Sequence, residues 1–157
     1  MGRGQRKSPL PPSMYTISKD IEFDAAHRLL DYVGPCAVLH GHRYLVSMVF
    51  TSATLNESGF VIDFSDVKRE VKAWVDLHWD HGTLLNVRDP LAPILKEMNQ
   101  KLYLMEFNPT AENIAFELYD VFIKVYSNLS SVIVWETPTS QAVYTPKAQA
   151  HSGGYTM

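Results

Sequence analysis

Two long segments with strand patterns follow each other near the start of the chain, and no helical pattern separates them. Residues 14–27 alternate apolar and polar side chains, and residues 42–54 are rich in β-branched and aromatic side chains. Residues 30–38 contain Gly34 and Pro35 and are typical of a loop. We therefore expect the two segments to pair as neighbouring strands of one sheet.

Helical patterns and two more strands occupy the rest of the chain. Residues 63–80, with Asp63 or Ser65 as N-cap, and residues 108–127, with Asn108 as cap, repeat their apolar side chains at helical spacing. The expected buried positions are Val67, Val71, Trp74, Val75 and His78 in the first helix, and Ile114, Leu118, Val121 and Val125 in the second. The pattern of residues 101–107 predicts an extended segment, and residues 131–146 form a hairpin pattern around Pro138. This pattern predicts an α+β fold with a four-stranded sheet, two helices on one face and the order ββααββ.

Length and composition set the class of protein. A chain of 157 residues fits one domain, which we place at residues 14–146, between a disordered basic tail at 1–13 and a frayed segment at 147–157. No apolar run approaches the ~20 residues of a membrane span, and a single cysteine forms no intrachain disulfide, so we expect a cytoplasmic protein. Three basic residues lie in the tail, which leaves an acidic body and argues against a nucleic-acid partner.

The segment "PCAVLHGHRY", residues 35–44, holds the first candidate site. On a strand, positions i and i+2 point to the same face, so His40 and His42 can chelate one ion, and neutral imidazole suits zinc. The alternative is a pair of half-exposed strand histidines without a metal. His27 ends the preceding strand and can reach the same place. Three ligands with an open fourth position are typical of a catalytic zinc.

Cys36 allows three interpretations. It can be a fourth ligand that closes the site, a small buried apolar side chain, or a thiolate that acts as base or nucleophile beside positive charge. The spacing does not separate these.

Two further carboxylates are candidates for chemistry. Asp80 precedes His81 and can orient its imidazole, although adjacent Asp–His pairs are common by chance and a histidine that caps the end of a helix is the simpler interpretation of the pair alone. Glu136 ends an apolar strand, and its two oxygens match a heterocycle edge with two N–H donors. The alternative for Glu136 is an exposed acid at a turn.

Six segments together resemble one family. They are "FDAAHRL", "CAVLHGHRY", "GFVIDFSDVK", "DHGTLLN", "NPTAENIA" and "VIVWET". Their order is similar to that of the 6-pyruvoyl-tetrahydropterin synthase / 6-carboxy-tetrahydropterin synthase family, over residues 15–145. The resemblance implies the tunnelling fold (T-fold), with four antiparallel strands and two helices on one face. It also implies homo-oligomers, either trimers or hexamers, with active sites between subunits.

The resemblance also implies roles for the candidate residues. By the family pattern, His27, His40 and His42 bind zinc, and Cys36 is the general base. Asp80 and His81 form a proton relay. Glu136 holds the pterin ring, and Thr110 and Glu112 lie near that ring.

Two branches of the family differ in the residues between the cysteine and the first histidine of the pair. The pyruvoyl-forming enzymes usually have five, and the carboxy-forming enzymes of the queuosine pathway usually have three. Here there are three, between Cys36 and His40. The resemblance thus implies a lyase that converts 7,8-dihydroneopterin triphosphate to 6-carboxy-5,6,7,8-tetrahydropterin, acetaldehyde and triphosphate. The alternatives are a 6-pyruvoyl-tetrahydropterin synthase and a non-catalytic zinc-binding domain.

Departures from the family pattern also exist. Arg43 follows the histidine pair where Asn or Ser is commoner, Trp79 precedes Asp80 where Leu is usual, and the segment before Asn86 has one additional residue. Arg28 and Arg43 are candidates for binding the triphosphate.

Overall fold

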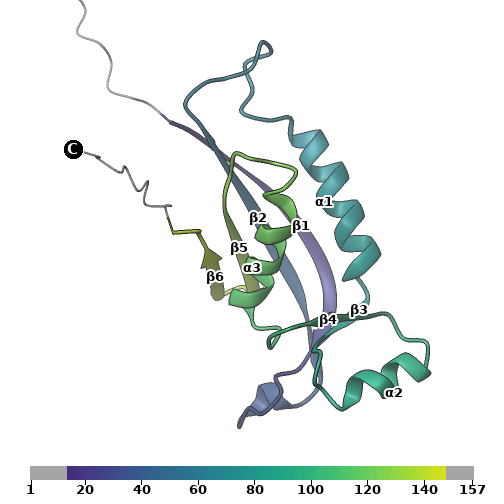
Figure 1. The fold of residues 1–157 in the computed structure, drawn as a ribbon. Coiled ribbons are helices and arrows are strands. Elements are labelled where there is room, and N and C mark those ends of the chain that lie inside the picture. The colour runs from purple at the N-terminus through teal and green to yellow at the C-terminus, as the bar shows by residue number, and fades with distance from the viewer. Residues whose placement is uncertain (1–13, 148–157) are drawn as a thin grey trace, which may run out of the picture.

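The computed structural model describes residues 14–147, which form one six-stranded sheet with helices against it (Figure 1). The strands are β1 (Tyr15–His27), β2 (His40–Ser52), β3 (Gly82–Asn86), β4 (Leu102–Met105), β5 (Leu129–Thr137) and β6 (Ser140–Tyr144). The helices are α1 (Phe64–His78), α2 (Leu91–Glu97) and α3 (Ala111–Phe122), with a single 3-10 turn, η1, at Pro35–Ala37. The predicted tails, residues 1–13 and 148–157, lie outside the described residues.

The order of strands across the sheet is β4-β3-β1-β2-β5-β6. β1 and β2 are antiparallel along their whole length, from Tyr15 opposite Ser52 to His27 opposite His40. β5 and β6 form the predicted hairpin. The predicted strand count of four is wrong, because β3 and β4 add two short parallel strands and α2 adds a third helix. β4 lies within residues 101–107, for which the sequence predicts an extended backbone but which the count of four leaves out. β3 and α2 have only five and seven residues, too few to show a period. The α+β class is confirmed.

One face of the sheet carries the core. α1 packs against β1, and α3 packs against β5 and β6 (Figure 1). Side chains at alternate positions of β1 and β2, such as Phe23 and Tyr44, are buried in one cluster with Val71 of α1 and Leu118 of α3. Each such side chain contributes about 1.5–3 kcal/mol when fully buried. The same alternation continues to His27 and His42, so the histidines lie on the helix-covered face.

The helix caps agree with the prediction at α1 and differ at α3. Asp63 Oδ1 accepts a hydrogen bond from the backbone N–H of Ser65 at 2.7 Å. At α3 the N-cap is Thr110, which accepts from the N–H of Asn113 at 3.3 Å, and not the predicted Asn108. The side chain of Asn108 instead forms hydrogen bonds with the backbone of Leu30. α3 also ends before Val125, which is 58% exposed, so its predicted burial is wrong.

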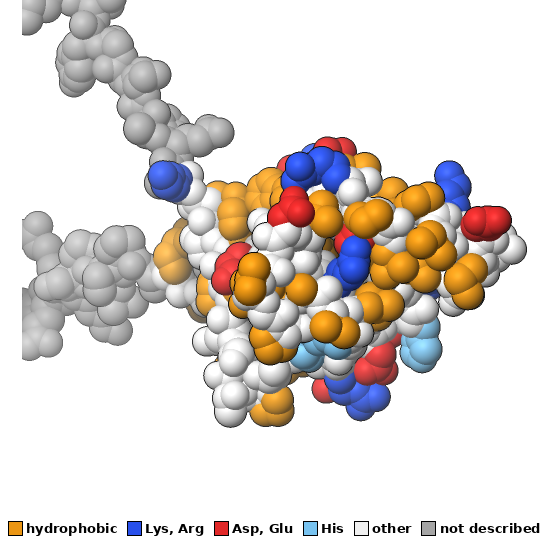
Figure 2. Space-filling model, turned by 90° about the horizontal axis from the view of Figure 1, so that it is seen from below, with side chains coloured by type: hydrophobic (Ala, Val, Ile, Leu, Met, Phe, Trp, Pro, Cys, Tyr) orange, Lys and Arg blue, Asp and Glu red, His pale blue; other side chains and the backbone are white. Residues whose placement is uncertain are grey.

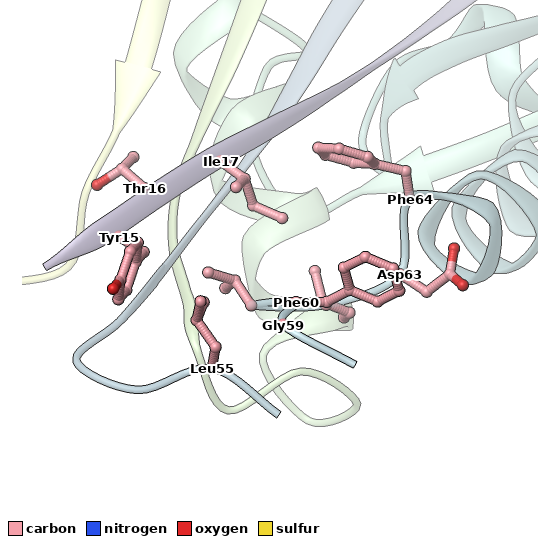
Figure 3. A pocket seen from close by; sticks show the side chains of 10 residues that line it. Tyr15, Thr16, Ile17, Leu55, Gly59, Phe60, Asp63 and Phe64 are labelled. Atoms are coloured by element: carbon pink, nitrogen blue, oxygen red, sulfur yellow. The ribbon is translucent and has the colours of Figure 1, made fainter. Parts of the chain in front are cut away.

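An apolar hollow of about 420 Å³ lies at the start of β1, at the far end of this strand from His27 (Figure 3). It is lined by Tyr15, Thr16, Ile17, Leu55, Gly59, Phe60, Val61, Ile62, Asp63 and Phe64. Its one carboxylate, that of Asp63, caps α1. The groups that can carry out chemistry lie at the other end of the strand. Within residues 14–147, no helix has the length and apolar character needed to cross a membrane.

Candidate metal centre and adjoining clefts

Three histidines meet where β1 ends and β2 begins. His27 lies opposite His40 in the antiparallel register, and His42 follows on the same face of β2. Within the described part of the chain, they are the one group of possible metal ligands whose ligand atoms all lie within 4.8 Å of one another. The structure therefore brings together the three residues that the sequence predicted as ligands.

Backbone carbonyls set the orientation of two of these imidazoles. Nδ1 of His27 lies 2.7 Å from the carbonyl oxygen of Pro109, and Nδ1 of His40 lies 2.7 Å from that of Val38. Because a carbonyl only accepts, each Nδ1 carries the proton and each Nε2 carries a lone pair. A metal-binding histidine usually donates its other ring N–H in this way.

The two Nε2 atoms face each other closely. They are 3.1 Å apart, so two lone pairs meet unless a cation lies between them. Two imidazole nitrogens bound to a tetrahedral zinc at 2.0–2.1 Å are separated by roughly 3.3 Å. The spacing therefore fits a metal ion of this size.

Burial favours the neutral, metal-binding form of the cluster. The pKa of His27 lies below its ordinary value because the ring is buried, although the nearby Glu136 opposes this effect. The pKa of His42 is lowered for the same reason, again against Glu136. The Nε2 atom of His42 is buried and has no hydrogen-bond partner. A buried polar nitrogen without a partner is costly, and a bound metal would satisfy it.

Cys36 lies in η1, in the loop between β1 and β2, and lines a cleft of about 250 Å³ beside the histidines. The cleft is lined by His27, Leu29, Cys36, Thr110, Ala111, Glu112, Glu136, Ser140, Gln141 and Ala142. The half-buried thiol is not a member of the ligand group formed by the histidines. The predicted substrate residues Thr110 and Glu112 are brought to the same cleft as Cys36 and Glu136.

Glu136 lies closer to the histidines than the sequence indicated. Its Oε1 atom is 3.3 Å from Nε2 of His27 and 3.7 Å from Nε2 of His42. The carboxylate comes from β5, the strand that pairs with β2. It thus lies between the candidate metal centre and the cleft of Cys36.

His81 lines a different hollow of about 570 Å³, together with Asp24, His42, Arg43 and Lys101, and Asp80 lies beside His81. Asp80 Oδ2 is 2.9 Å from Nδ1 of His81, and its Oδ1 accepts from the backbone N–H of Asp24 at 2.9 Å. This hollow shares no lining residue with the cleft of Cys36. Within one chain, the predicted relay and the predicted base are therefore not brought together.

A hydrogen bond to its neighbour makes the relay carboxylate more acidic. Burial alone would raise the pKa of Asp80, but hydrogen bonds from the Asp24 N–H and from His81 hold it below its ordinary value. His81 itself is 79% exposed and adopts a positive φ of 56°. The pair therefore presents an open imidazole backed by a carboxylate.

The two arginines predicted as triphosphate ligands are both paired with carboxylates. Arg28 donates from Nε and Nη2 to the buried Asp89, at 2.7 and 2.5 Å. Arg43 makes a looser and exposed pair with Asp24. Arg28 therefore forms an ion pair with Asp89 directly after the end of β1, whereas Arg43 lines the hollow of His81 at the surface.

The sequence motifs did not indicate the residues that support the site. The carbonyl of Pro109 orients His27 and the side chain of Asn108 holds the cysteine loop, although the pattern of their segment predicts the start of a helix. Tyr44 is fully buried, and its ring lies against those of His27 and His42. The alternation that places His42 on this face also places Tyr44 there, so the signal was present. Trp79, one of the departures noted above, is buried in the core against Phe23.

Figure 2 views the molecule from the end that carries these sites. Histidine side chains reach the surface in separate places, and apolar side chains cover much of the area between them. Exposed apolar side chains near the cysteine include Tyr32, Val33, Val38 and Leu39. Exposed apolar side chains gathered in one loop are typical of a surface that contacts a partner.

Comparison with known proteins gives a consistent result. The sequence profile of the 6-pyruvoyl tetrahydropterin synthase family matches residues 16–147. The chain is 36% identical over 132 residues to the 6-carboxy-5,6,7,8-tetrahydropterin synthase of Rickettsia bellii, covering 80% of this chain and 96% of that protein. It is 38% identical over 140 residues to the Haemophilus influenzae protein of the same name, covering 83% and 99%.

Solved structures agree on the fold. An uncharacterized protein from Wolinella succinogenes superposes with a TM-score of 0.73 at 25% identity, covering 85% of this chain and 98% of that one. The 6-pyruvoyl tetrahydropterin synthase of Caenorhabditis elegans superposes with a TM-score of 0.64 at 23% identity, covering 85% and 96%. The second likeness shows the fold alone.

Proposed function

The chain belongs to the 6-pyruvoyl tetrahydropterin synthase family, and from this premise we propose that it is a zinc-dependent 6-carboxy-5,6,7,8-tetrahydropterin synthase. Its substrates are 7,8-dihydroneopterin triphosphate and one water molecule, and its products are 6-carboxy-5,6,7,8-tetrahydropterin, acetaldehyde and triphosphate. The observation that carries the proposal is the single cleft in which Cys36, Glu136 and His27 meet. The names of the curated relatives support the carboxy-forming branch, as does the three-residue spacing between Cys36 and His40.

The histidines fit the metal that the proposal requires. The facing lone pairs of His27 and His40, the lowered pKa values of His27 and His42, and the unpartnered Nε2 of His42 together indicate a neutral nitrogen donor set. Zinc is the metal that such a set with an open position favours. When bound, zinc supplies a Lewis acid at the substrate side chain.

The protein side chains divide the remaining work. Glu136 accepts hydrogen bonds from the amino-pyrimidine edge of the pterin, because a carboxylate matches two parallel N–H donors. Cys36 takes a proton from the side chain of the substrate as a thiolate, a form that nearby positive charge favours. Thr110 and Glu112 line the same cleft and contact the ring.

The relay completes the site from another copy of the chain. His81, oriented by Asp80, shuttles a proton on the opposite side of the substrate, but its hollow is separate from the cleft of Cys36 in one chain. A homo-oligomer that joins the two places, either a trimer or a hexamer, satisfies both requirements. The exposed apolar surface near Cys36 supports such an assembly.

Product analysis tests the proposal. The zinc-loaded protein is incubated with 7,8-dihydroneopterin triphosphate, and acetaldehyde and the pterin product are quantified by enzymatic assay and mass spectrometry. We expect stoichiometric acetaldehyde and 6-carboxy-5,6,7,8-tetrahydropterin. A 6-pyruvoyl product without acetaldehyde would instead assign the chain to the pyruvoyl-forming branch.

Cys36→Ala is the matched control, because it separates a base from a ligand. If the thiol is the base, zinc content is kept and turnover is lost. If the thiol closes a structural site, zinc is lost and the fold is destabilised with it.

A further inference from the structure

The side-chain amide of Asn108 forms a reciprocal pair of hydrogen bonds with the backbone of Leu30. Its Nδ2 donates to the carbonyl oxygen of Leu30 at 2.8 Å, and its Oδ1 accepts from the N–H of Leu30 at 2.9 Å. The amide satisfies both backbone groups of one residue, as a neighbouring strand would. No other orientation of the amide satisfies both bonds, so the contact fixes Leu30 in place.

Leu30 belongs to the segment that carries the thiol. The N–H of Leu29 donates to the carbonyl oxygen of Cys36 at 2.8 Å and closes residues 29–36 into a loop. The other end of this loop is the single 3-10 turn, in which Val38 donates to Pro35 at 3.1 Å. The backbone of Cys36 is therefore held through Leu29, whose neighbour Leu30 is held by Asn108.

Asn108 is itself anchored to the helix behind it. The side-chain Nδ2 of Asn113, in the first turn of α3, donates to the carbonyl oxygen of Asn108 at 2.9 Å. The next residue, Pro109, is buried and accepts the hydrogen bond from His27. One point at the start of α3 therefore fixes both the cysteine loop and a candidate metal ligand.

This arrangement also sets the width of the cleft. Leu29 and Cys36 line one side of it, and Thr110 and Glu112 at the start of α3 line another. The amide of Asn108, through its two hydrogen bonds to Leu30, links these two walls of the cleft. Without it, the loop of Cys36 can move away from α3 while the metal cluster stays intact.

We propose that Asn108 is a positioning residue that holds the thiol of Cys36 at its working place in the cleft. The proposal deepens the function proposed above and rests on it for the role of Cys36. A displacement of about 1 Å at a reacting group can cost about 100-fold in rate, so a fixed loop matters for a proton abstraction.

The reactivity of Cys36 tests the proposal without turnover. Cys36 is the only cysteine of the chain, so the mass of the whole protein reports its alkylation by iodoacetamide. In the zinc-loaded Asn108→Ala variant, we expect alkylation about tenfold faster than in the parent, because the loop opens locally. Asn56→Ala is the matched control, because Asn56 also orders a loop, by accepting from Ser58 and Phe60, far from this cleft.

Turnover and zinc content complete the test. We expect Asn108→Ala to keep one zinc per chain and to lose about 10–100-fold in kcat with little change in KM. Asn108→Asp keeps the size and the acceptor but loses the donor to Leu30, and it serves if the alanine variant does not fold. An alkylation rate equal to that of the parent overturns the proposal. Failure of the proposed function appears separately, as an inactive parent protein whose alkylation still depends on Asn108.

Discussion

Nδ1 of His27 and the carbonyl oxygen of Pro109 lie 2.7 Å apart, although 82 residues separate them in the sequence. Because this contact fixes the protonated nitrogen, Nε2 of His27 points toward His40 and His42. The candidate metal centre is thus built by two strands and completed by the segment that begins α3. The orientation of His27 thus depends on a backbone carbonyl, which no pattern of side chains in the sequence indicates.

Loss of one histidine of the cluster is expected to abolish tight metal binding. Replacement of an outer hydrogen-bond partner alone costs about 10–100-fold in affinity, so His42→Ala should weaken zinc binding by more than about 100-fold. Competition with a chromophoric chelator measures the affinity. His78→Ala is the control, because His78 stacks on Trp74 in α1 and lies outside the cluster. Equal losses in both variants would contradict the assignment.

The sequence predicted this cluster because its causes are local. Alternation along β2 places His40 and His42 on one face, and pairing of two adjacent strands brings His27 opposite His40. The two strands follow each other in the sequence with no helical pattern between them, so the pairing partner was clear. These are the conditions under which periodicity alone specifies a contact.

The remaining parts of the site depend on contacts between distant segments. Asn108 has the residue type and position of a helix cap, and only the fold shows that it bonds Leu30 while Thr110 caps α3. β3 and β4 pair in parallel over four or five residues, which is too short for a period. The separation of His81 from Cys36 follows from this part of the sheet, so it could not be read from either motif.

Glu136 is expected to bind the substrate and not the metal. In Glu136→Gln, we expect zinc affinity within a few-fold of the parent and binding of a non-reactive pterin weakened by about 10–100-fold, because a charged hydrogen bond is lost. Pterin fluorescence measures the second quantity. Glu117→Gln, whose carboxylate accepts from Tyr103 elsewhere, is the control. A steep loss of zinc in Glu136→Gln would make the carboxylate a ligand, which its 3.3 Å distance from His27 Nε2 makes worth testing.

The ion pair between Arg28 and Asp89 is expected to stabilise the chain in a pH-dependent way. Burial alone would raise the pKa of Asp89, but hydrogen bonds from Arg28 and from the N–H of Leu91 hold it below its ordinary value. Because the pKa of Asp89 is lower in the folded chain than in the unfolded chain, where it is about 3.9, the charged carboxylate stabilises the fold above pH ~3.9. This stability is lost as the pH falls through the pKa of the folded state. Asp89→Asn should cost about 1–3 kcal/mol near neutral pH, because the partly exposed arginine loses its charged partner.

Urea unfolding of both proteins between pH 3 and pH 7 measures this difference, which we expect to narrow toward the acidic end. Arg69→Ala removes an exposed partner of Asp66 and should change stability little at any of these pH values. A difference between parent and Asp89→Asn that is constant with pH would show that the ion pair does not act through the Asp89 charge.

Mixed oligomers test whether the active site joins two chains. The Cys36 cleft and the His81 hollow share no lining residue within one chain, so each active site should take its thiol from one copy and its relay from another. Cys36→Ala and His81→Ala homo-oligomers should each be inactive. After the two are unfolded and refolded together, random assembly restores about a quarter of the sites, because each site needs an intact residue from each neighbour.

The matched control refolds Cys36→Ala with Glu136→Gln, whose altered residues line the same cleft, and the activity of this mixture should stay near the level of the parents. If both parents are inactive and neither mixture recovers activity, the thiol and the relay act within one chain. An active His81→Ala homo-oligomer would mean that the relay takes no part in the reaction.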